Sequence, residues 1–425
     1  MSTPKRPDTL EYSFEKEGVS RNIHPRAPVQ TTMITETTAS WTAAFRSAVI
    51  SPHEKSDLFE RRSFSAQTLR QIIRLDGGGT ALRIRLTNRY GRTPLHIGGA
   101  HLALRTRGSG IEPGSDTPLH VDGTADFTIP AGGEALTDPI ERPVTAGDEL
   151  ALTLWLPDDT GPATYSAVPL RTGYAVPGNA LTTPTLDGTQ GLEELATRHF
   201  IAGADVLAPR GTAVTVAFGD SWFEGTGTTP DTDNRFPDLL NQRLRAAGST
   251  GWVVNQGLSA NRLLTDEIGE HALARLEHDV LDVPGATHVL LHFGLNDLGI
   301  PGQEAYPATA PIPTAADLIT GLTTLADRLH AAGLTTIATT VGPYKDTVFE
   351  GYATPEGLAV AREVNDWIRG TESPFDAYAD FAAAVADPAD PDRIHDDYDS
   401  GDGLHVNDAG AQALADSVDL TTLKS

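Results

Sequence analysis

From residue 213 to the C-terminus, the sequence alternates short apolar runs with amphipathic segments. Residues 213–218 form an apolar run without polar alternation, which is typical of a parallel strand covered on both faces. Residues 315–332 place a leucine at every third or fourth position and end before Gly333, as an amphipathic helix does. Alternating strands and helices predict a parallel sheet with helices on both faces. In such a sheet, ligands bind at the carboxyl ends of the strands.

The remaining elements expected in this half continue the same alternation. They are helices over 236–248, 271–281, 355–370 and 408–418, and strands over 252–255, 289–293, 336–341 and 378–381. The sequence therefore predicts an α/β domain, which we place at residues 206–425.

The first half of the chain has a different pattern of apolar and polar residues. Residues 81–87 alternate apolar and polar side chains, and residues 150–156 repeat this period of two. Glycine-rich turns such as 76–79 separate these segments. Many short strands with glycine turns predict a β-sandwich, which we place at residues 39–205. Residues 1–38 are polar with little periodicity, so we expect a loosely ordered arm there.

Composition restricts the partners of this protein. Its 425 residues carry 57 acidic against 32 basic side chains, a formal net charge of −25. Nucleic acid and anionic membranes attract cationic surfaces, so neither is an expected partner. The absence of cysteine excludes disulfides, thiolate catalysis and cysteine-bound zinc. The first residues lack the apolar core of a signal peptide, and no run of eighteen apolar residues occurs, so we expect a cytoplasmic protein.

Three polar side chains suggest nucleophilic catalysis. Ser221 closely follows the first apolar run, and Asp402 and His405 stand just before the last expected helix. A serine becomes a nucleophile when a neutral imidazole accepts its proton, and His405 can be that base. Asp402, three residues earlier, can accept from the other ring nitrogen and stabilise the imidazolium. We therefore predict a Ser-His-Asp triad.

Hydrolysis of an acyl bond also needs hydrogen-bond donors aimed at the developing oxyanion. The backbone N–H groups of Ser221 and Gly257 and the side-chain amide of Asn296 follow three different strands, so they can meet at one sheet edge. We predict that these donors form the oxyanion hole. This set of residues implies no metal and no organic cofactor.

Gly219-Asp220-Ser221, Gly257, Gly294-x-Asn296-Asp297 and Asp402-x-x-His405 resemble, in this order, the sequence blocks of the SGNH (GDSL-type) hydrolases. In that family the serine is the nucleophile, the serine, glycine and asparagine supply oxyanion donors, and the Asp-x-x-His pair completes the triad. The resemblance covers the last half of the chain and implies a three-layer, flavodoxin-like sheet. With the β-sandwich in front, the chain is similar to bacterial two-domain members with an N-terminal jelly-roll domain. Such proteins are often acetyl or short-chain esterases acting on carbohydrates.

Two positions depart from the family pattern. Trp222 replaces the usual leucine or isoleucine after the serine, and Ala260 stands where a glycine is common. A large indole beside the nucleophile would narrow the acyl pocket, so we expect acetyl and propionyl esters to be preferred. We also expect Asn261 and Arg262 to contact the substrate, although Arg262 could instead pin its own loop.

Alternatives from other classes are open. The same triad with a longer acyl pocket would make a lipase or thioesterase, and a lapsed site would leave a carbohydrate-binding protein. The acidic run 396–402 lacks the final glutamate of a calcium loop, so we interpret it as solvated. We expect Asp220, Asp297 and His292 to be structural. The proline-rich insertion at 301–313 could form a lid resting on the sandwich.

Overall fold

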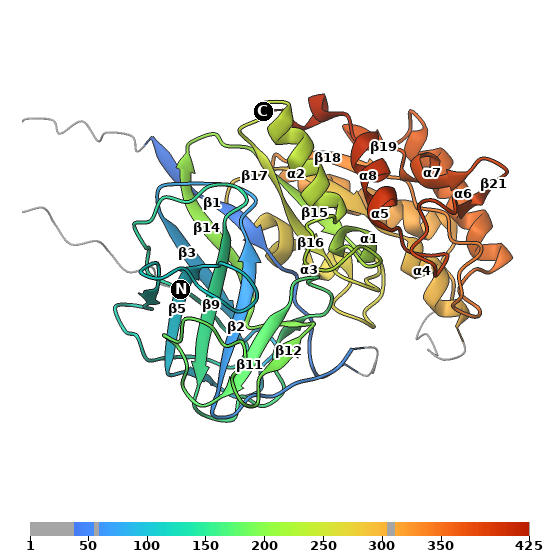
Figure 1. Ribbon diagram of the computed structural model, residues 1–425. Helices are drawn as coiled ribbons and strands as arrows, with labels where there is room; N and C mark the ends of the chain where they lie inside the picture. Colours follow the sequence, from blue (N-terminus) through green and yellow to red (C-terminus); the bar gives the residue numbers. More distant parts are fainter. Residues whose placement is uncertain (1–37, 55–58, 304–310, 425) are drawn as a thin grey trace, which may run out of the picture. The chain divides into compact units, whose positions relative to one another are not determined.

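The computed structural model describes residues 38–54, 59–303 and 311–424 (Figure 1). The expected arm at 1–38 therefore lies outside the described residues except for its last position, and so do residues 304–310 of the expected lid. Residues 38–425 form one compact unit by their internal contacts. No helix within the described ranges is long and apolar enough to cross a membrane.

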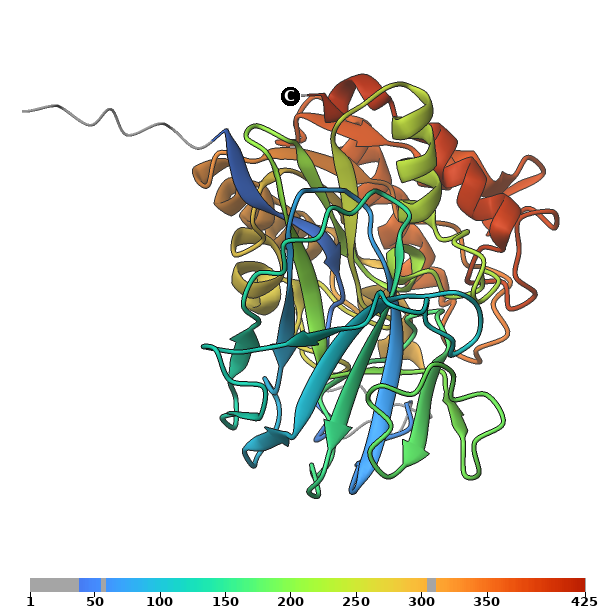
Figure 2. The same ribbon diagram turned by 60° about the vertical axis from the view of Figure 1, so that its left-hand side comes forward.

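Two antiparallel sheets make up the first half of this unit (Figure 2). One has the order β1 (Ala39–Arg46), β14 (Ile201–Pro209), β3 (Leu82–Thr87) and β8 (Glu134–Leu136). The other has the order β12 (Glu193–Leu195), β11 (Gly173–Pro177), β2 (Gln67–Arg74), β9 (Glu149–Leu156), β5 (Gly99–Leu104) and β6 (Thr117–Leu119). Two small pairs accompany them: β4 (Leu95–Ile97) with β7 (Phe127–Ile129), and β10 (Tyr165–Ser166) with β13 (Arg198–His199).

The expected period of two holds in these strands. Leu152 of β9 and Ile84 of β3 belong to the same buried apolar cluster, which joins the inner faces of both sheets. Ala151, one residue from Leu152, points the other way and packs in a separate cluster with Tyr174. Successive side chains of a strand alternate between faces, so each sheet turns one apolar face inward. This arrangement confirms the predicted β-sandwich.

The second half contains a five-stranded sheet in which every pairing is parallel. Its order is β16 (Trp252–Gly257), β15 (Val214–Gly219), β17 (Ala286–His292), β18 (Thr335–Thr339) and β19 (Ala377–Ala379). In chain order this is 2-1-3-4-5, the flavodoxin-like arrangement, with its topological switch point beside β15. The predicted fold class is confirmed.

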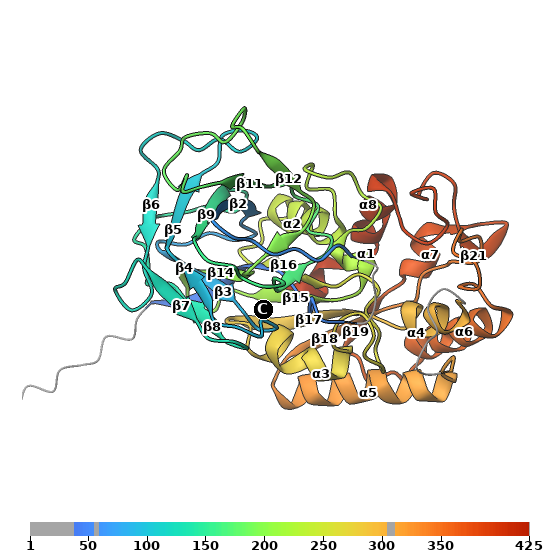
Figure 3. The same cartoon turned by 90° about the horizontal axis from the view of Figure 1, so that it is seen from below.

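Helices cover both faces of this sheet (Figure 3). On one face α2 (Phe236–Ala246) packs against α8 (Asp408–Ser417). On the other, α5 (Ala315–Ala331) packs against α3 (Ala272–Leu276) and α6 (Pro355–Arg369). A capping box starts α5, in which the Thr314 hydroxyl accepts from the Asp317 backbone and the Asp317 carboxylate accepts in return.

Several expected elements are subdivided. The helix expected over 271–281 is α3 followed by a π-helical turn, Glu277–Leu281. The strand expected over 378–381 is β19, which stops at Ala379 because Asp380 caps a new helix, α7 (Phe381–Val385). The short elements are α1 (Ser221–Glu224), α4 (Leu295–Gly299), the hairpin β20 (Ala386–Asp387) and β21 (Asp390–Ile394), and the 3₁₀ turns Ile300–Gly302 and Leu420–Leu423. Because β14 runs to Pro209, the antiparallel region extends past the boundary placed at 205/206.

The sandwich packs directly on the edge strand of the parallel sheet. The indole Nε1 of Trp252 in β16 donates to the carbonyl of Ala43 in β1 at 2.6 Å. The backbone N–H of Ala43 donates to Pro284 at 2.8 Å. Gly77 lies so close to the Trp252 ring that a Cβ at this position would fall 2.1 Å from a ring carbon. The two halves of the chain therefore pack into one buried apolar core. They are not separate domains joined by a solvated linker.

Candidate active site

Ser221 lies where the first parallel strand ends. The strand β15 stops at Gly219, and Asp220 caps the short helix α1, accepting from the backbone N–H of Trp222 at 3.0 Å. Ser221 is therefore the first residue of a helix at the carboxyl edge of the sheet, where its own N–H needs no helical partner. The side chain is 3% exposed.

His405 and Asp402 meet Ser221 from the loop before α8. Nε2 of His405 lies 3.0 Å from Oγ of Ser221, and Nδ1 lies 2.7 Å from Oδ2 of Asp402. When Nδ1–H donates to the carboxylate, Nε2 is left as the acceptor for the serine hydroxyl. The structure brings the three residues of the predicted triad together in hydrogen-bonding order.

The carboxylate of Asp402 is held in its ionised form. Partial burial works against ionisation, but the hydrogen bond and charge of His405 and the backbone N–H groups of Leu404 and His405 outweigh it. Together they lower the pKa of Asp402 to about 2. An ionised Asp402 fixes the imidazole tautomer that a general base requires.

The backbone N–H of Gly257 already has an acceptor, which corrects its predicted role as an oxyanion donor. Its backbone N–H donates to Oδ1 of Asn255 at 2.8 Å. A Cβ at Gly257 would fall 2.1 Å from the backbone nitrogen of Glu224, so glycine is needed there for close packing of α1. The strand β16 continues through Gly257, and Ser259 and Ala260, which line the cavity together with Ser221, come after its end.

Ala260 takes the place expected of Gly257. It lines the same cavity as Ser221, and it adopts a left-handed conformation with φ of +62°. Within the described part of the chain, the backbone N–H groups of Ser221 and Ala260 have no protein acceptor. The available signal in the sequence was Ala260 at a position where the resembled family commonly has glycine, the residue that adopts positive φ most easily.

Asn296 lies in α4 and lines the cavity as predicted. Its Nδ2 donates to the carbonyl of Asn261 at 3.0 Å and makes a longer contact of 3.3 Å with Oδ2 of Asp220. Its Oδ1 accepts from the hydroxyl of Tyr352 at 2.8 Å. Tyr352 also lines the cavity, and sequence reasoning did not identify it.

A cavity of about 450 Å³ opens over Ser221 and His405. Most of its wall is apolar. The contributing side chains are Phe59, Val168, Ile268, Ile300, Phe349 and Leu404. Phe59 and Val168 come from the first half of the chain, so the sandwich region helps to build the site.

Trp222 does not form a wall of this cavity, which corrects the expectation that it contacts the substrate. Its indole is 1% exposed, stacks on His292 at 5.2 Å between ring centroids, and donates from Nε1 to the carbonyl of Leu404 at 3.0 Å. Consecutive helical residues point about 100° apart, so a cavity-facing Ser221 directs Trp222 into the core. Its contact is with the loop that carries His405.

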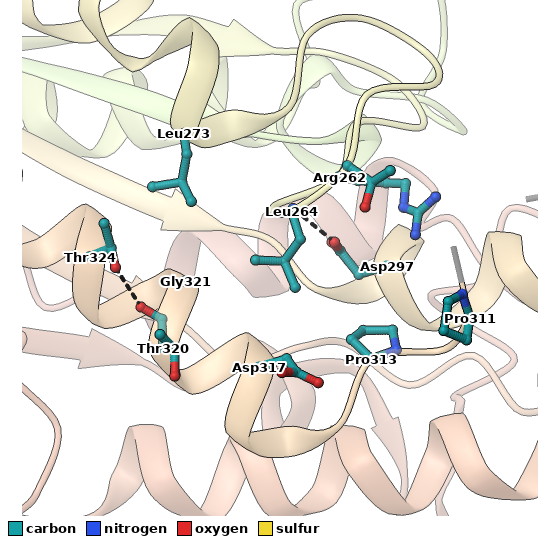
Figure 4. Close-up of a pocket in the computed structure, with 11 residues that line it drawn as sticks. Arg262, Leu264, Leu273, Asp297, Pro311, Pro313, Asp317, Thr320, Gly321 and Thr324 are labelled. Carbon is teal, nitrogen blue, oxygen red and sulfur yellow. Dashed lines mark hydrogen bonds between the residues drawn. The ribbon is translucent and has the colours of Figure 1, made fainter. Parts of the chain in front are cut away.

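Asn261 and Arg262 also turn away from Ser221. The Asn261 side chain donates to the carbonyls of Ile268 and Glu270, so it braces its own loop. Arg262 pairs with Glu267 at 2.9 Å and lines a separate pocket of about 400 Å³. Figure 4 shows Arg262 and Leu264 at this pocket, opposite residues of α5. Neither residue lies where the predicted substrate contact requires it.

We expected Asp297 and His292 to be structural, and their hydrogen bonds fit this role. Asp297 accepts from the backbone N–H groups of Leu263 and Leu264 at 2.7 and 3.0 Å. Burial lowers the pKa of His292 to about 3, and its Nδ1 lies 2.6 Å from the Thr339 hydroxyl. Among the described residues, no cluster of three or more His, Asp or Glu side chains could hold a metal ion.

The second half of the chain matches a known protein family. Residues 217–413 match the model of the "GDSL-like Lipase/Acylhydrolase family". No curated protein matches the sequence.

Solved structures also align with about half of this chain. A putative lipolytic protein of the G-D-S-L family from Desulfitobacterium hafniense is 19% identical, with a TM-score of 0.35 over 48% of this chain and 96% of that one. A putative arylesterase from Agrobacterium tumefaciens is 17% identical, with a TM-score of 0.35 over 48% and 96%. A carbohydrate acetylesterase from Sinorhizobium meliloti is 15% identical, with a TM-score of 0.36 over 48% and 94%.

Proposed function

We propose that this chain is a serine hydrolase of carboxylic esters, because residues 217–413 match the model of the GDSL-like lipase and acylhydrolase family. One observation carries the proposal. Ser221, His405 and Asp402 form a continuous hydrogen-bonded chain, with distances of 3.0 and 2.7 Å, at the floor of the apolar cavity. Such an order of nucleophile, base and orienting carboxylate is the arrangement that activates a serine.

In the proposed reaction, Oγ of Ser221 attacks the ester carbonyl carbon while its proton passes to Nε2 of His405. The carboxylate of Asp402 stabilises the imidazolium. The backbone N–H groups of Ser221 and Ala260 and the amide of Asn296 hold the oxyanion. His405 then gives its proton to the departing alcohol, which leaves an acyl-serine. Water, deprotonated by His405, hydrolyses this acyl-enzyme.

Two measurements test this mechanism. Ser221→Ala and His405→Ala should each lower kcat on p-nitrophenyl butyrate by about three orders of magnitude or more, and Asp402→Ala should cost less. A fluorophosphonate probe should label the wild type but not Ser221→Ala. Ser259→Ala is the matched control, because Ser259 lines the same cavity and should still permit labelling. Near wild-type turnover by Ser221→Ala would end the proposal.

The cavity also bears on the substrate. The expectation of a short acyl group, such as acetyl on a carbohydrate, rested on Trp222, which lies outside the cavity. A cavity of about 450 Å³ is in the usual size range of small-molecule sites, and its apolar side chains favour an ester with a sizeable hydrocarbon or aryl group. We therefore extend the proposal to aromatic esters and to longer acyl esters or thioesters, which are the substrates of a lipase or a thioesterase.

A p-nitrophenyl ester series from acetate to decanoate separates the two possibilities. Each methylene housed in the cavity should add roughly 0.8 kcal/mol of binding at most, so kcat/KM should rise from acetate to a medium chain. A maximum at acetate with a steep fall by butyrate would favour the short-acyl alternative.

A further inference from the structure

One aromatic side chain lies across the helix that carries Asn296. Tyr352 is in the connection between β18 and α6 and is 3% exposed. Its ring occupies the space beside Gly299, where a Cβ would fall 2.1 Å from ring carbon Cε1. Asn296 and Gly299 are three residues apart in α4, so they lie on the same face of the helix. The ring is therefore seated on Gly299 with its hydroxyl over Asn296.

The Asn296 amide is held from both ends. On the nitrogen side, the carbonyl of Asn261 takes one N–H at 3.0 Å, whereas the other has only the 3.3 Å contact with Asp220. On the oxygen side, the hydroxyl of Tyr352 donates at 2.8 Å. A donor at Oδ1 makes the amide N–H groups stronger donors, because hydrogen bonds in series polarise one another. The N–H with the longer contact to Asp220 is the one that would be redirected to an oxyanion.

We propose that Tyr352 is a positioning residue of the oxyanion hole, which fixes and polarises the Asn296 amide so that Nδ2–H stabilises the tetrahedral oxyanion. This inference rests on the esterase function proposed above. Burial raises the pKa of Tyr352 well above its ordinary value, so the hydroxyl remains a donor across the working pH range. Within the described residues, the Tyr352 hydroxyl bonds to Asn296 and not to Ser221 or His405, so we expect it to act through the Asn296 amide.

The neighbouring Tyr344 provides a matched control. Its ring packs edge-on against Tyr352, with centroids 5.8 Å apart, and is 0% exposed. Its hydroxyl has no hydrogen-bond partner in the described structure. Tyr352→Phe and Tyr344→Phe therefore each remove one buried hydroxyl from adjoining rings, but only the first removes a donor to the Asn296 amide.

The test compares these variants in the full-length chain on p-nitrophenyl butyrate. Tyr352→Phe should lower kcat about tenfold with KM within about twofold of the wild type, the scale of one lost hydrogen bond in the transition state. Tyr344→Phe should leave kcat and KM unchanged. Both variants should unfold cooperatively, so a loss in Tyr352→Phe alone cannot come from misfolding.

A second comparison places the effect in Asn296. In an Asn296→Ala background, which itself should lose about a hundredfold or more in kcat, Tyr352→Phe should cause no further loss. Equal losses in both backgrounds, a change mainly in KM, or full activity of Tyr352→Phe would overturn the proposal. If Asn296→Ala keeps full kcat while Ser221→Ala is inactive, the oxyanion assignment fails but the esterase function stands. If Ser221→Ala is active, the function itself fails.

Discussion

Side-chain direction decides what Trp222 does. The residue follows Ser221 directly in the sequence, yet its indole lies in the core against His292 and Phe381. A Cβ at Gly342 would fall 2.0 Å from the indole, so the ring fills the space beside that backbone. The hydrogen bond from its Nε1 to the carbonyl of Leu404 places the ring behind the loop that presents His405. Trp222 thus supports the base rather than limiting the acyl group.

This contact predicts the effect of Trp222→Phe. The variant loses the Nε1–H donor and leaves a smaller ring, so it should melt at a lower temperature and show a lower kcat. Because the cavity wall is untouched, the ratio of kcat/KM between p-nitrophenyl acetate, butyrate and octanoate should stay as in the wild type. If kcat/KM of the variant increases for octanoate relative to acetate, Trp222 does limit the length of the acyl group.

At the scale of elements, the four-residue helix α1 is too short to be stable alone and depends on contacts outside it. Glu224, its last residue, is buried between the two halves of the chain. One carboxylate oxygen accepts from the backbone N–H of Val168 at 2.9 Å, and the other from that of Ser259 at 2.5 Å. Ser259 precedes Ala260, so Glu224 links the sandwich to the loop of the proposed oxyanion donor.

Glu224→Gln should loosen this loop. The amide nitrogen of glutamine would face one of two backbone donors, so at least one buried N–H loses its acceptor. We expect kcat on a p-nitrophenyl ester to fall about tenfold or more, with a lower melting temperature. Ser166→Ala, which removes only a 3.4 Å contact with Glu224, is the control and should change neither value. Wild-type kcat in Glu224→Gln would show that the loop needs no such brace.

At the scale of the whole molecule, burial raises the pKa of several acidic side chains. Burial, with the charge of Asp238 next, raises the pKa of Asp76 to about 8 against the opposing Arg235 and Arg74. Burial likewise raises the pKa of Asp220 to about 8 and that of Glu224 in the same direction. In the unfolded chain a carboxyl titrates near pH 4 (about 3.9 to 4.3). Between about pH 4 and 8 the folded state therefore binds protons that the unfolded state has lost.

From about pH 7 to 8 the histidines of the unfolded chain, whose ordinary pKa is about 6.5, are mostly neutral, so the buried carboxyls set the sign and the free energy of unfolding should decrease as pH rises. Asp76→Asn should flatten this decrease, because asparagine has no proton to lose and keeps an oxygen for the amide of Asn241. Asp327→Asn, at an exposed position of α5, is the control and should leave the slope unchanged. Urea unfolding at each pH measures these slopes. A stability that increases over this range would contradict the prediction.

Removal of the sandwich tests the shared core. A fragment starting at residue 210 lacks β1 and β14, so Trp252 becomes exposed. It also lacks Phe59 and Val168, which line the cavity of Ser221. We expect poor solubility, no cooperative melting transition and a low kcat/KM even on p-nitrophenyl acetate. A soluble, cooperatively folding and fully active fragment would show that the sandwich is a separable module.

The sequence alone determined the order of strands and helices, because periods of 2 and 3.6 residues are local properties of burial. It also predicted that Ser221, Asn296, Asp402 and His405 lie close together, as they do in the structure. Ser221 and Asn296 follow parallel strands and His405 precedes a helix at the same sheet edge, and Asp402 is three residues from His405. Boundaries at Asp380 and Glu277 were less predictable, because a cap and a π-helical turn depend on only a few atoms.

Only the tertiary structure decided which backbone and ring groups face the cavity. The backbone N–H that we propose as an oxyanion donor is that of Ala260 and not that of Gly257, because β16 extends through Gly257. The length of a strand depends on the neighbouring strand with which it pairs. Trp222, Asn261 and Arg262 sit close to the site in sequence, but helix rotation and loop bonding turn their side chains elsewhere. Tyr352 and Val168 reach the site from distant segments, and no local period or spacing records which segments pack together.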